Sequence, residues 1–192
     1  RARHGAGAYF DEGTSADIAG CTFTGNSANY NGGGAYFATA SPADFTDCRL
    51  SGNTAGAGGI SGNGGGVCLA GPGEYSFINC LIAGNTGYYG AGIYGSGATL
   101  TILHATMAGN DSSGYTNGGI HFSGGSAAIT NSVLWGIFYN DTVKWEPVVT
   151  GTPALLNITY CDISQEEYQE NTGCKDQQPR FIGGSHPYMM DY

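Results

Sequence analysis

A four-residue motif returns along this chain at intervals close to 27 residues, and this period constrains the fold more than any other feature. Each copy begins with an apolar residue and ends in Gly-Asn; the copies are Phe-Thr-Gly-Asn at 23–26, Leu-Ser-Gly-Asn at 50–53, Ile-Ala-Gly-Asn at 82–85 and Met-Ala-Gly-Asn at 107–110. A Gly-rich segment with a strand pattern follows each copy, at 32–37, 64–69, 90–94 and 118–122. A fixed period with apolar residues in register is typical of a stacked solenoid.

Apolar residues occupy equivalent positions in successive repeats. The repeats align on small residues spaced by 27, 32, 25, 27 and 29 positions, namely Cys21, Cys48, Cys80, Ala105, Ser132 and Cys161. Three residues before each stands a large apolar side chain: Ile18, Phe45, Phe77, Ile102, Ile129 and Ile158. Two residues after each stands another: Phe23, Leu50, Ile82, Met107, Leu134 and Ile163. The alternation within each segment has period 2, so these segments are expected to be strands with one face inward.

Three short strands per repeat, each aligned with its counterpart in the next repeat, predict an all-β fold. Strands aligned in this way build parallel sheets, which together close a parallel β-helix of about six to seven coils of roughly 27 residues. Residues 1–163 are predicted to form the coils, and residues 164–192 a terminal coil and a C-terminal tail. The pattern weakens after Trp135, where Ile137 replaces the expected Asn. Arg1 stands just before a Gly-rich strand segment, as expected of a processed or excised piece.

The composition argues against several function classes. The formal net charge is −9, from 15 acidic and 6 basic residues. The chain therefore lacks the basic surface that binds nucleic acid or anionic membranes. No apolar run is long enough for a transmembrane segment, and no secretory leader is recognisable. Low charge with abundant Gly, Asn, Ser and Thr suits an extracellular or cell-surface location.

The pairing of Phe-Thr-Gly-Asn at 23–26 with Gly-Gly-Ala-Tyr at 33–36 resembles the repeat of chlamydial polymorphic outer-membrane proteins. It is also similar to the wider set of right-handed β-helix repeats in large secreted bacterial chains, and the likeness covers residues 5–135. The segment at 157–163, with Pro-Arg-Phe-Ile at 179–182, is similar to the closing part of those chains. The resemblance implies a right-handed, single-stranded β-helix that serves as a surface passenger or adhesin, without a shared catalytic residue set.

The repeated Gly and Asn residues are assigned to turns. The glycines Gly25, Gly52, Gly84 and Gly109 suit backbone conformations with positive φ. The asparagines that follow can hydrogen-bond to one another from coil to coil, as amides do in stacked β arrays. A structural role is therefore predicted for Asn26, Asn53, Asn85 and Asn110.

The cysteines are expected to be mainly structural. Cys21, Cys48 and Cys80 share the inward column with Ala and Ser, so the position favours a small buried side chain. Cys161 and Cys174 lie 13 residues apart and are the best disulfide candidate. The alternation of its strand places the Cys68 side chain outward, as a free or partnered thiol. Metal binding is not expected, because the cysteines lack a neighbouring His or a metal-ligand spacing.

Paired carboxylates are the clearest enzyme candidate. Asp17 and Asp44 both stand four residues before their column residue, on the outward face of adjacent coils. Such neighbours would lie about 5 Å apart, near the separation in a retaining glycosidase, or could ligate calcium. The alternative is two solvated carboxylates, because no base accompanies them. A lyase would need a base, and Arg49 is explained equally well by an ion pair with Asp47. Neither His104 nor His121 has an evident nucleophile partner.

Two lines of tyrosines are predicted on the outer surface. Tyr9, Tyr36 and Tyr94, with His121, lie on the outward face of the Gly-rich strands, while Tyr30, Tyr88 and Tyr115 follow one turn. Exposed aromatic strips mark contact surfaces, because tyrosine offers a large area and keeps a hydrated hydroxyl group. Stacking on sugar rings, contact between subunits and simple stacking between coils all remain open.

The ends of a β-helix expose unpaired backbone groups, so self-association through the coil ends is predicted, with Tyr188 and Tyr192 of the C-terminal tail at the junction. We expect a non-enzymatic extracellular structural or adhesive protein that assembles head to tail into a filament. The alternatives are a carbohydrate-binding module, and a polysaccharide lyase or glycosidase that uses Asp17 and Asp44. No cofactor is expected apart from calcium at that carboxylate pair.

Overall fold

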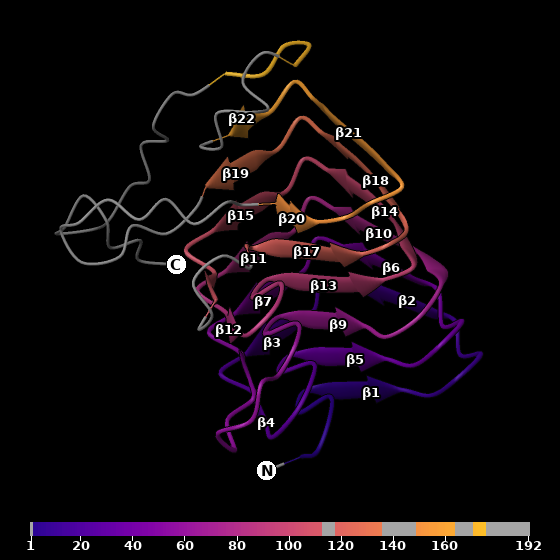
Figure 1. Cartoon of the computed structure of the whole chain (residues 1–192), viewed down its shortest axis with the longest axis vertical. Coiled ribbons are helices and arrows are strands. Elements are labelled where there is room, and N and C mark those ends of the chain that lie inside the picture. The colour runs from indigo at the N-terminus through magenta and orange to yellow at the C-terminus, as the bar shows by residue number, and fades with distance from the viewer. Residues whose placement is uncertain (1, 113–117, 136–148, 164–170, 176–192) are drawn as a thin grey trace, which may run out of the picture.

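The computed structural model describes residues 2–112, 118–135, 149–163 and 171–175. In these residues the chain winds as a right-handed parallel β-helix built of strands and turns, without helices. Figure 1 shows the coils stacked along the long axis, with β1 near the N-terminal end and β22 near the other. Three of the sheets contain six strands each, so the chain makes about five complete turns from its first pass to its last.

The Gly-rich strands form the first sheet, whose members in order are β1 (Ala8–Phe10), β5 (Ala35–Phe37), β9 (Val67–Leu69), β13 (Ile93–Ser96), β17 (Ile120–Ser123) and β20 (Val149–Gly151). The second sheet consists of β2 (Ala16–Ala19), β6 (Ala43–Thr46), β10 (Gly73–Ile78), β14 (Ala98–Leu103), β18 (Ser126–Thr130) and β21 (Leu155–Thr159). The third sheet consists of β3 (Thr22–Thr24), β7 (Arg49–Ser51), β11 (Leu81–Ala83), β15 (Thr106–Ala108), β19 (Val133–Trp135) and β22 (Asp162–Ile163). All pairs are parallel and in register, which confirms the predicted β-helix.

A fourth sheet differs from the three strands per coil that the sequence predicts. Its members are only two residues long: β4 (Ser27–Ala28), β8 (Thr54–Ala55), β12 (Thr86–Gly87) and β16 (Asp111–Ser112). They follow the repeated Asn, whose backbone carbonyl accepts a hydrogen bond from the next coil, as Asn26 does from Thr54 N at 2.8 Å. Segments this short contain no full alternation, so hydrophobic periodicity cannot reveal them.

The predicted columns line an unbroken apolar interior. Phe45, Phe77 and Ile102 are fully buried and lie in register on neighbouring strands of the second sheet. The rings of Phe45 and Phe77 stack with centroids 4.7 Å apart, and those of Phe10 and Phe37 stack at 4.3 Å. This interior supplies the burial that offsets the ordering entropy of a Gly-rich chain.

Two corners of the coil use left-handed backbone conformations. The predicted glycines before the repeated Asn all have positive φ, between 60° and 65°. A second corner, between the second and third sheets, uses Gly20 in the first coil and non-glycine residues in the later ones: Asp47, Asn79, His104, Asn131 and Tyr160. Asn, Asp and His occur in this conformation more often than other non-glycine residues, whereas Tyr is unusual there, and each side chain larger than glycine adopts it at some cost.

The last described residues add a partial coil. Lys175 pairs with Asp162, and the Lys175 N–H donates to Cys161 O at 3.0 Å. Most of the predicted terminal coil and tail, including Tyr188 and Tyr192, lies outside the described residues. Within the described ranges there is no helix that is long and apolar enough to span a membrane.

Candidate functional site

The repeated asparagines form a ladder of hydrogen bonds through the stack. Asn26 donates from Nδ2 to Asn53 Oδ1 at 2.9 Å, Asn53 to Asn85 at 2.9 Å, and Asn85 to Asn110 at 2.9 Å. In each step the backbone N–H of the donor residue reaches the same oxygen, at 3.0 to 3.1 Å. Asn53 and Asn85 are fully buried. Their amides satisfy one another and the backbone, as buried polar groups must.

The carboxylate pair lies where the sequence predicts, but in an open setting. Asp17 and Asp44 are register partners on β2 and β6, and both are exposed. The next strand contributes Ser76, whose Oγ donates to Asp44 Oδ1 at 2.5 Å. Arg49 Nε donates instead to Ser51 Oγ at 3.1 Å on the third sheet. The pair therefore has a hydroxyl neighbour, and its catalytic use stays a prediction.

Candidate metal ligands do not converge in the described part of the chain. No group of three or more His, Cys, Asp or Glu side chains is arranged there to hold a metal ion. Asp47, at its corner, accepts a hydrogen bond from Asn79 Nδ2 at 2.5 Å. The proposed calcium site at Asp17 and Asp44 thus rests on the two carboxylates and nothing further. His104, at the same kind of corner, is exposed.

All six cysteines are free thiols in the structure. Cys48, Cys80 and Cys161 are buried in the small-residue column, whereas Cys21 at the first coil is exposed. Burial raises the pKa of Cys80 and of Cys161 to about 11. Cys174 contributes to the raised pKa of Cys161, so the predicted disulfide pair consists of neighbouring thiols, and the bond itself stays a prediction.

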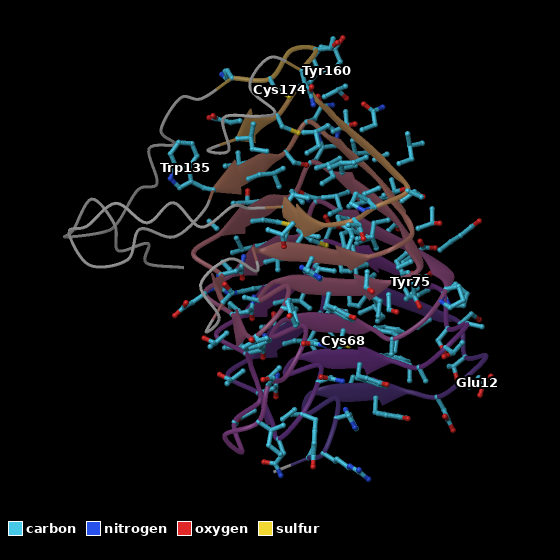
Figure 2. The ribbon with its side chains drawn as sticks, in the orientation of Figure 1. Glu12, Cys68, Tyr75, Trp135, Tyr160 and Cys174 are labelled. Carbon is cyan, nitrogen blue, oxygen red and sulfur yellow. The ribbon has the colours of Figure 1, made fainter. Side chains whose placement is uncertain are left out.

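The expectation for Cys68 is wrong in one respect, because its side chain is not accessible. Cys68 lies between Tyr36 and Tyr94 in the register of the first sheet but is only 1% exposed. A short side chain between two large rings is covered by them, so an outward position need not be a solvated one. Burial raises the pKa of the Cys68 thiol far above its ordinary value, which makes it inert. Figure 2 shows Cys68 midway along the stack.

The aromatic residues gather in two clusters instead of continuous files, because Cys68 interrupts the column. We call the first one the lower cluster: His4, Tyr9, Tyr30 and Tyr36. His4 lies against Tyr30 and Tyr36, with ring centroids 5.4 and 4.9 Å away. Tyr9 stacks on Tyr36 at 5.2 Å and is 53% exposed. The Arg3 guanidinium lies 5.4 Å from the Tyr30 ring centre and makes a cation–π contact.

The upper cluster comprises Tyr88, Tyr89, Tyr94 and His121. His121 lies 4.6 Å from Tyr89 and stacks on Tyr94 at 5.8 Å, while its Nδ1 hydrogen-bonds with Thr150 Oγ1 at 2.9 Å. Burial lowers the pKa of His121, and burial together with Arg3 lowers that of His4, so both rings favour the neutral form. Tyr115, predicted for the same turn as Tyr88, lies outside the described residues.

His4 and Tyr89 belong to these clusters, although the strand pattern of the sequence does not single them out. His4 lies 27 residues before Asn31, whose backbone N–H donates to His4 Nδ1 at 3.4 Å, so the repeat spacing contained the signal. Tyr89 is adjacent to Tyr88 and could have been found as a second ring on the same turn. Each cluster thus places a neutral His between two Tyr rings on the outer side of the first sheet, an arrangement suited to contact with flat or apolar groups.

No protein family model, curated protein or solved structure matches this chain.

Proposed function

We propose that this chain is a non-enzymatic, extracellular adhesive β-helix whose contact surface is formed by the two aromatic clusters of the first sheet. The observation that carries the proposal is the position of both clusters on the outer side of the same sheet, on either side of Cys68. Aromatic rings with polar edges provide large contact areas at low entropy cost. The motif likeness to chlamydial polymorphic outer-membrane proteins supports a surface role, as an analogy between repeats.

The surrounding chemistry supports adhesion over catalysis. The exposed carboxylates Asp17 and Asp44 lie on the second sheet, away from the aromatic clusters of the first. Catalytic acids and bases usually combine burial with a charged partner, which shifts their pKa toward the working pH. Asp44 has a hydroxyl neighbour in Ser76 and remains exposed.

The test uses the full chain and two matched double variants. Labelled protein is applied to a glycan array and to cultured epithelial cells, and bound label is measured after washing. Tyr9→Ala with Tyr36→Ala removes the stacked pair of the lower cluster, whereas Thr99→Ala with Thr101→Ala alters an exposed part of the second sheet. We expect the tyrosine variant alone to lose binding. Equal binding by both variants would contradict the proposal.

A polysaccharide lyase or glycosidase is the second candidate, because Asp17 and Asp44 are direct register neighbours. Neighbouring strands lie about 4.8 Å apart, close to the separation of about 5 Å in retaining glycosidases. Release of reducing sugar, or absorbance of unsaturated uronates, is compared between the unmodified chain and Asp44→Asn. Turnover by the unmodified chain that disappears in Asp44→Asn would establish an enzymatic function and would contradict the proposal of a non-enzymatic adhesive protein.

Head-to-tail self-association is the part of the proposal that concerns assembly. β1, β2 and β3 each end their sheet, and Phe10 and Phe23 beside them are half-buried, whereas Phe37 and Leu50 in the next coil are fully buried. A second copy that stacks on this edge would cover the half-buried rings and pair the strands. Sedimentation velocity over a concentration series tests it, and Phe23→Asp should shift the distribution toward monomer. A monomer at every concentration would exclude assembly.

A further inference from the structure

We propose that Cys161 and Cys174 are a site of reversible disulfide formation that closes the last described turn of the solenoid. The inference goes beyond the adhesive role and does not depend on it. It rests on the place of Cys174 in the stack, on the contact between the two thiols and on the spacing between coils.

Cys174 continues the small-residue column as its seventh member. In the column, the residue after each member donates its backbone N–H to the carbonyl of the member one coil earlier: Arg49 to Cys21, Leu81 to Cys48, Thr106 to Cys80, Val133 to Ala105 and Asp162 to Ser132, each at 2.9 Å. Lys175 repeats this bond to Cys161 O at 3.0 Å. Cys174 therefore stacks on Cys161 as Cys48 stacks on Cys21, although only 13 residues separate them.

The side chains of Cys161 and Cys174 also meet. Cys174 lies close enough to Cys161 to contribute to the raised pKa of the Cys161 thiol. Each sulfur also lies near a carbonyl of the preceding coil, Ile129 O for Cys161 at 3.6 Å and Ile158 O for Cys174 at 3.7 Å. Cys161 is buried, whereas Cys174 is half-buried at the edge of the core. Figure 2 shows Cys174 at the end of the stack, near Tyr160. A reagent thus reaches the pair from the side of Cys174.

The spacing between coils explains why this pair would close and the others would not. Equivalent atoms of stacked strands lie about 4.8 Å apart, whereas the Cβ atoms of a disulfide lie about 3.8 Å apart. Cys48 and Cys80 belong to coils fixed by sheet pairing on both sides. Residues 171–175 pair with the last coil on one side, where the Tyr160 N–H donates to Thr172 O at 2.8 Å, and closure of the disulfide requires this segment to move by the missing distance.

The Cys21 and Cys48 pair provides the internal comparison. The Cys48 sulfur accepts a hydrogen bond from the Cys21 backbone N–H at 3.4 Å, while the Cys21 thiol donates to Ala19 O at 3.3 Å. Cys21 is exposed and has Cys48 directly beside it, but Cys48 belongs to a coil that is fixed by sheet pairing on both sides.

The oxidant we name is a small-molecule disulfide such as oxidised glutathione. The Cys174 thiol loses its proton, and its sulfur attacks the reagent, which forms a mixed disulfide and releases one reduced thiol. The Cys161 thiol then loses its proton, and its sulfur attacks the Cys174 sulfur and releases the second reduced thiol. Two protein thiols are oxidised and one reagent disulfide is reduced to two thiols. Burial raises the pKa of Cys161, so this second step should be accelerated at alkaline pH.

The experiment treats the folded full chain with oxidised glutathione, blocks the remaining thiols with N-ethylmaleimide and maps the peptides by mass spectrometry. We expect a peptide that joins Cys161 to Cys174, migration as a monomer on a non-reducing gel, and loss of the cross-link after dithiothreitol. Cys161→Ser should accumulate glutathione on Cys174, because the resolving thiol is missing. Cys80→Ser is the control and should leave the cross-link unchanged.

Three outcomes would overturn the inference. Both thiols could remain fully alkylated after oxidation, Cys174 could pair with a different cysteine, or Cys161→Ser could leave Cys174 without glutathione. Circular dichroism of each variant confirms that it is folded before its peptide map is compared.

Discussion

Asn53 donates two hydrogen bonds to a single oxygen of Asn85, from Nδ2 at 2.9 Å and from its backbone N–H at 3.0 Å. Asn85 Nδ2 in turn donates to Leu50 O and to Asn110 Oδ1, each at 2.9 Å. Both amides are fully buried, so neither can exchange these partners for water. The relationship gives the ladder a direction, since the side-chain oxygens of Asn53, Asn85 and Asn110 each accept from the Asn one coil earlier, while their side-chain nitrogens also donate to a carbonyl of that earlier coil.

Asn85→Ala should therefore lower the free energy of unfolding by about 3 kcal/mol, because it leaves two buried donors of Asn53 without their acceptor and removes one hydrogen bond to the Leu50 carbonyl. Asn26→Ala is the matched control at the first rung, where the side chain is half-buried and loses one bond, and it should cost about 1 kcal/mol. Urea unfolding followed by circular dichroism measures both. Equal losses at the two positions would mean that burial of the ladder does not matter.

The stacked rings of Phe45 and Phe77 allow a test of the interior. Phe77 is fully buried, so Phe77→Ala should lower the free energy of unfolding by about 4 kcal/mol through lost burial and a cavity. Phe77→Leu retains most of the volume and should cost about 1.5 kcal/mol or less. A double-mutant cycle with Phe45→Leu should show a coupling of about 1 kcal/mol for the ring pair. A coupling of zero would contradict direct stacking.

The fold was readable from the sequence because a stacked coil converts spacing along the chain into adjacency in space. Once Phe45, Phe77 and Ile102 are aligned by period, their shared inward column follows from the alternation of a strand. The Asn positions follow in the same way. A one-dimensional pattern is sufficient here, since each coil contacts mainly its immediate neighbours.

The lateral surface was less predictable, because it depends on the sizes of neighbouring side chains and on turns. Cys68 has an outward position, yet the rings of Tyr36 and Tyr94 on either side leave it buried. His4 joins the lower cluster through a segment outside the strand pattern. Cys174 enters the small-residue column 13 residues after Cys161, half the usual period, so alignment by period places it elsewhere.

Replacement of His104 by glycine should stabilise the protein. His104 has a φ of 54° and is exposed, so its backbone conformation is strained without compensation from side-chain burial. A left-handed residue costs about 1–2 kcal/mol, and glycine's extra freedom in the unfolded chain costs about 0.5–1 kcal/mol. His104→Gly should therefore raise the free energy of unfolding by about 0.5–1 kcal/mol. His104→Ala retains the backbone strain and should not raise the free energy of unfolding. If alanine stabilises the protein and glycine does not, backbone strain at this position is not the cause.

The stability of the protein should fall on mild acidification because of the half-buried histidine of the upper cluster, His121. Burial between Tyr89 and Tyr94 lowers the pKa of His121 below its ordinary value of 6.5, so the folded state favours the neutral ring. Below 6.5 the unfolded chain binds a proton that the folded chain does not, and the free energy of unfolding decreases until the pH passes the lower, folded pKa. Above 6.5 this contribution is fully present.

His121→Gln should reduce the loss of unfolding free energy between pH 6.5 and lower pH. The loss that His4 contributes should remain, since the pKa of His4 is also lowered. The urea midpoint is measured between about pH 5 and pH 8 for the unmodified chain, His121→Gln, and the double variant with His4→Gln, which should be flatter still. Thr101→Ala, at an exposed position of the second sheet without a titratable side chain, is the control and should reproduce the unmodified profile. If His121→Gln retains the full acid dependence, protonation of the upper cluster is not what weakens the fold.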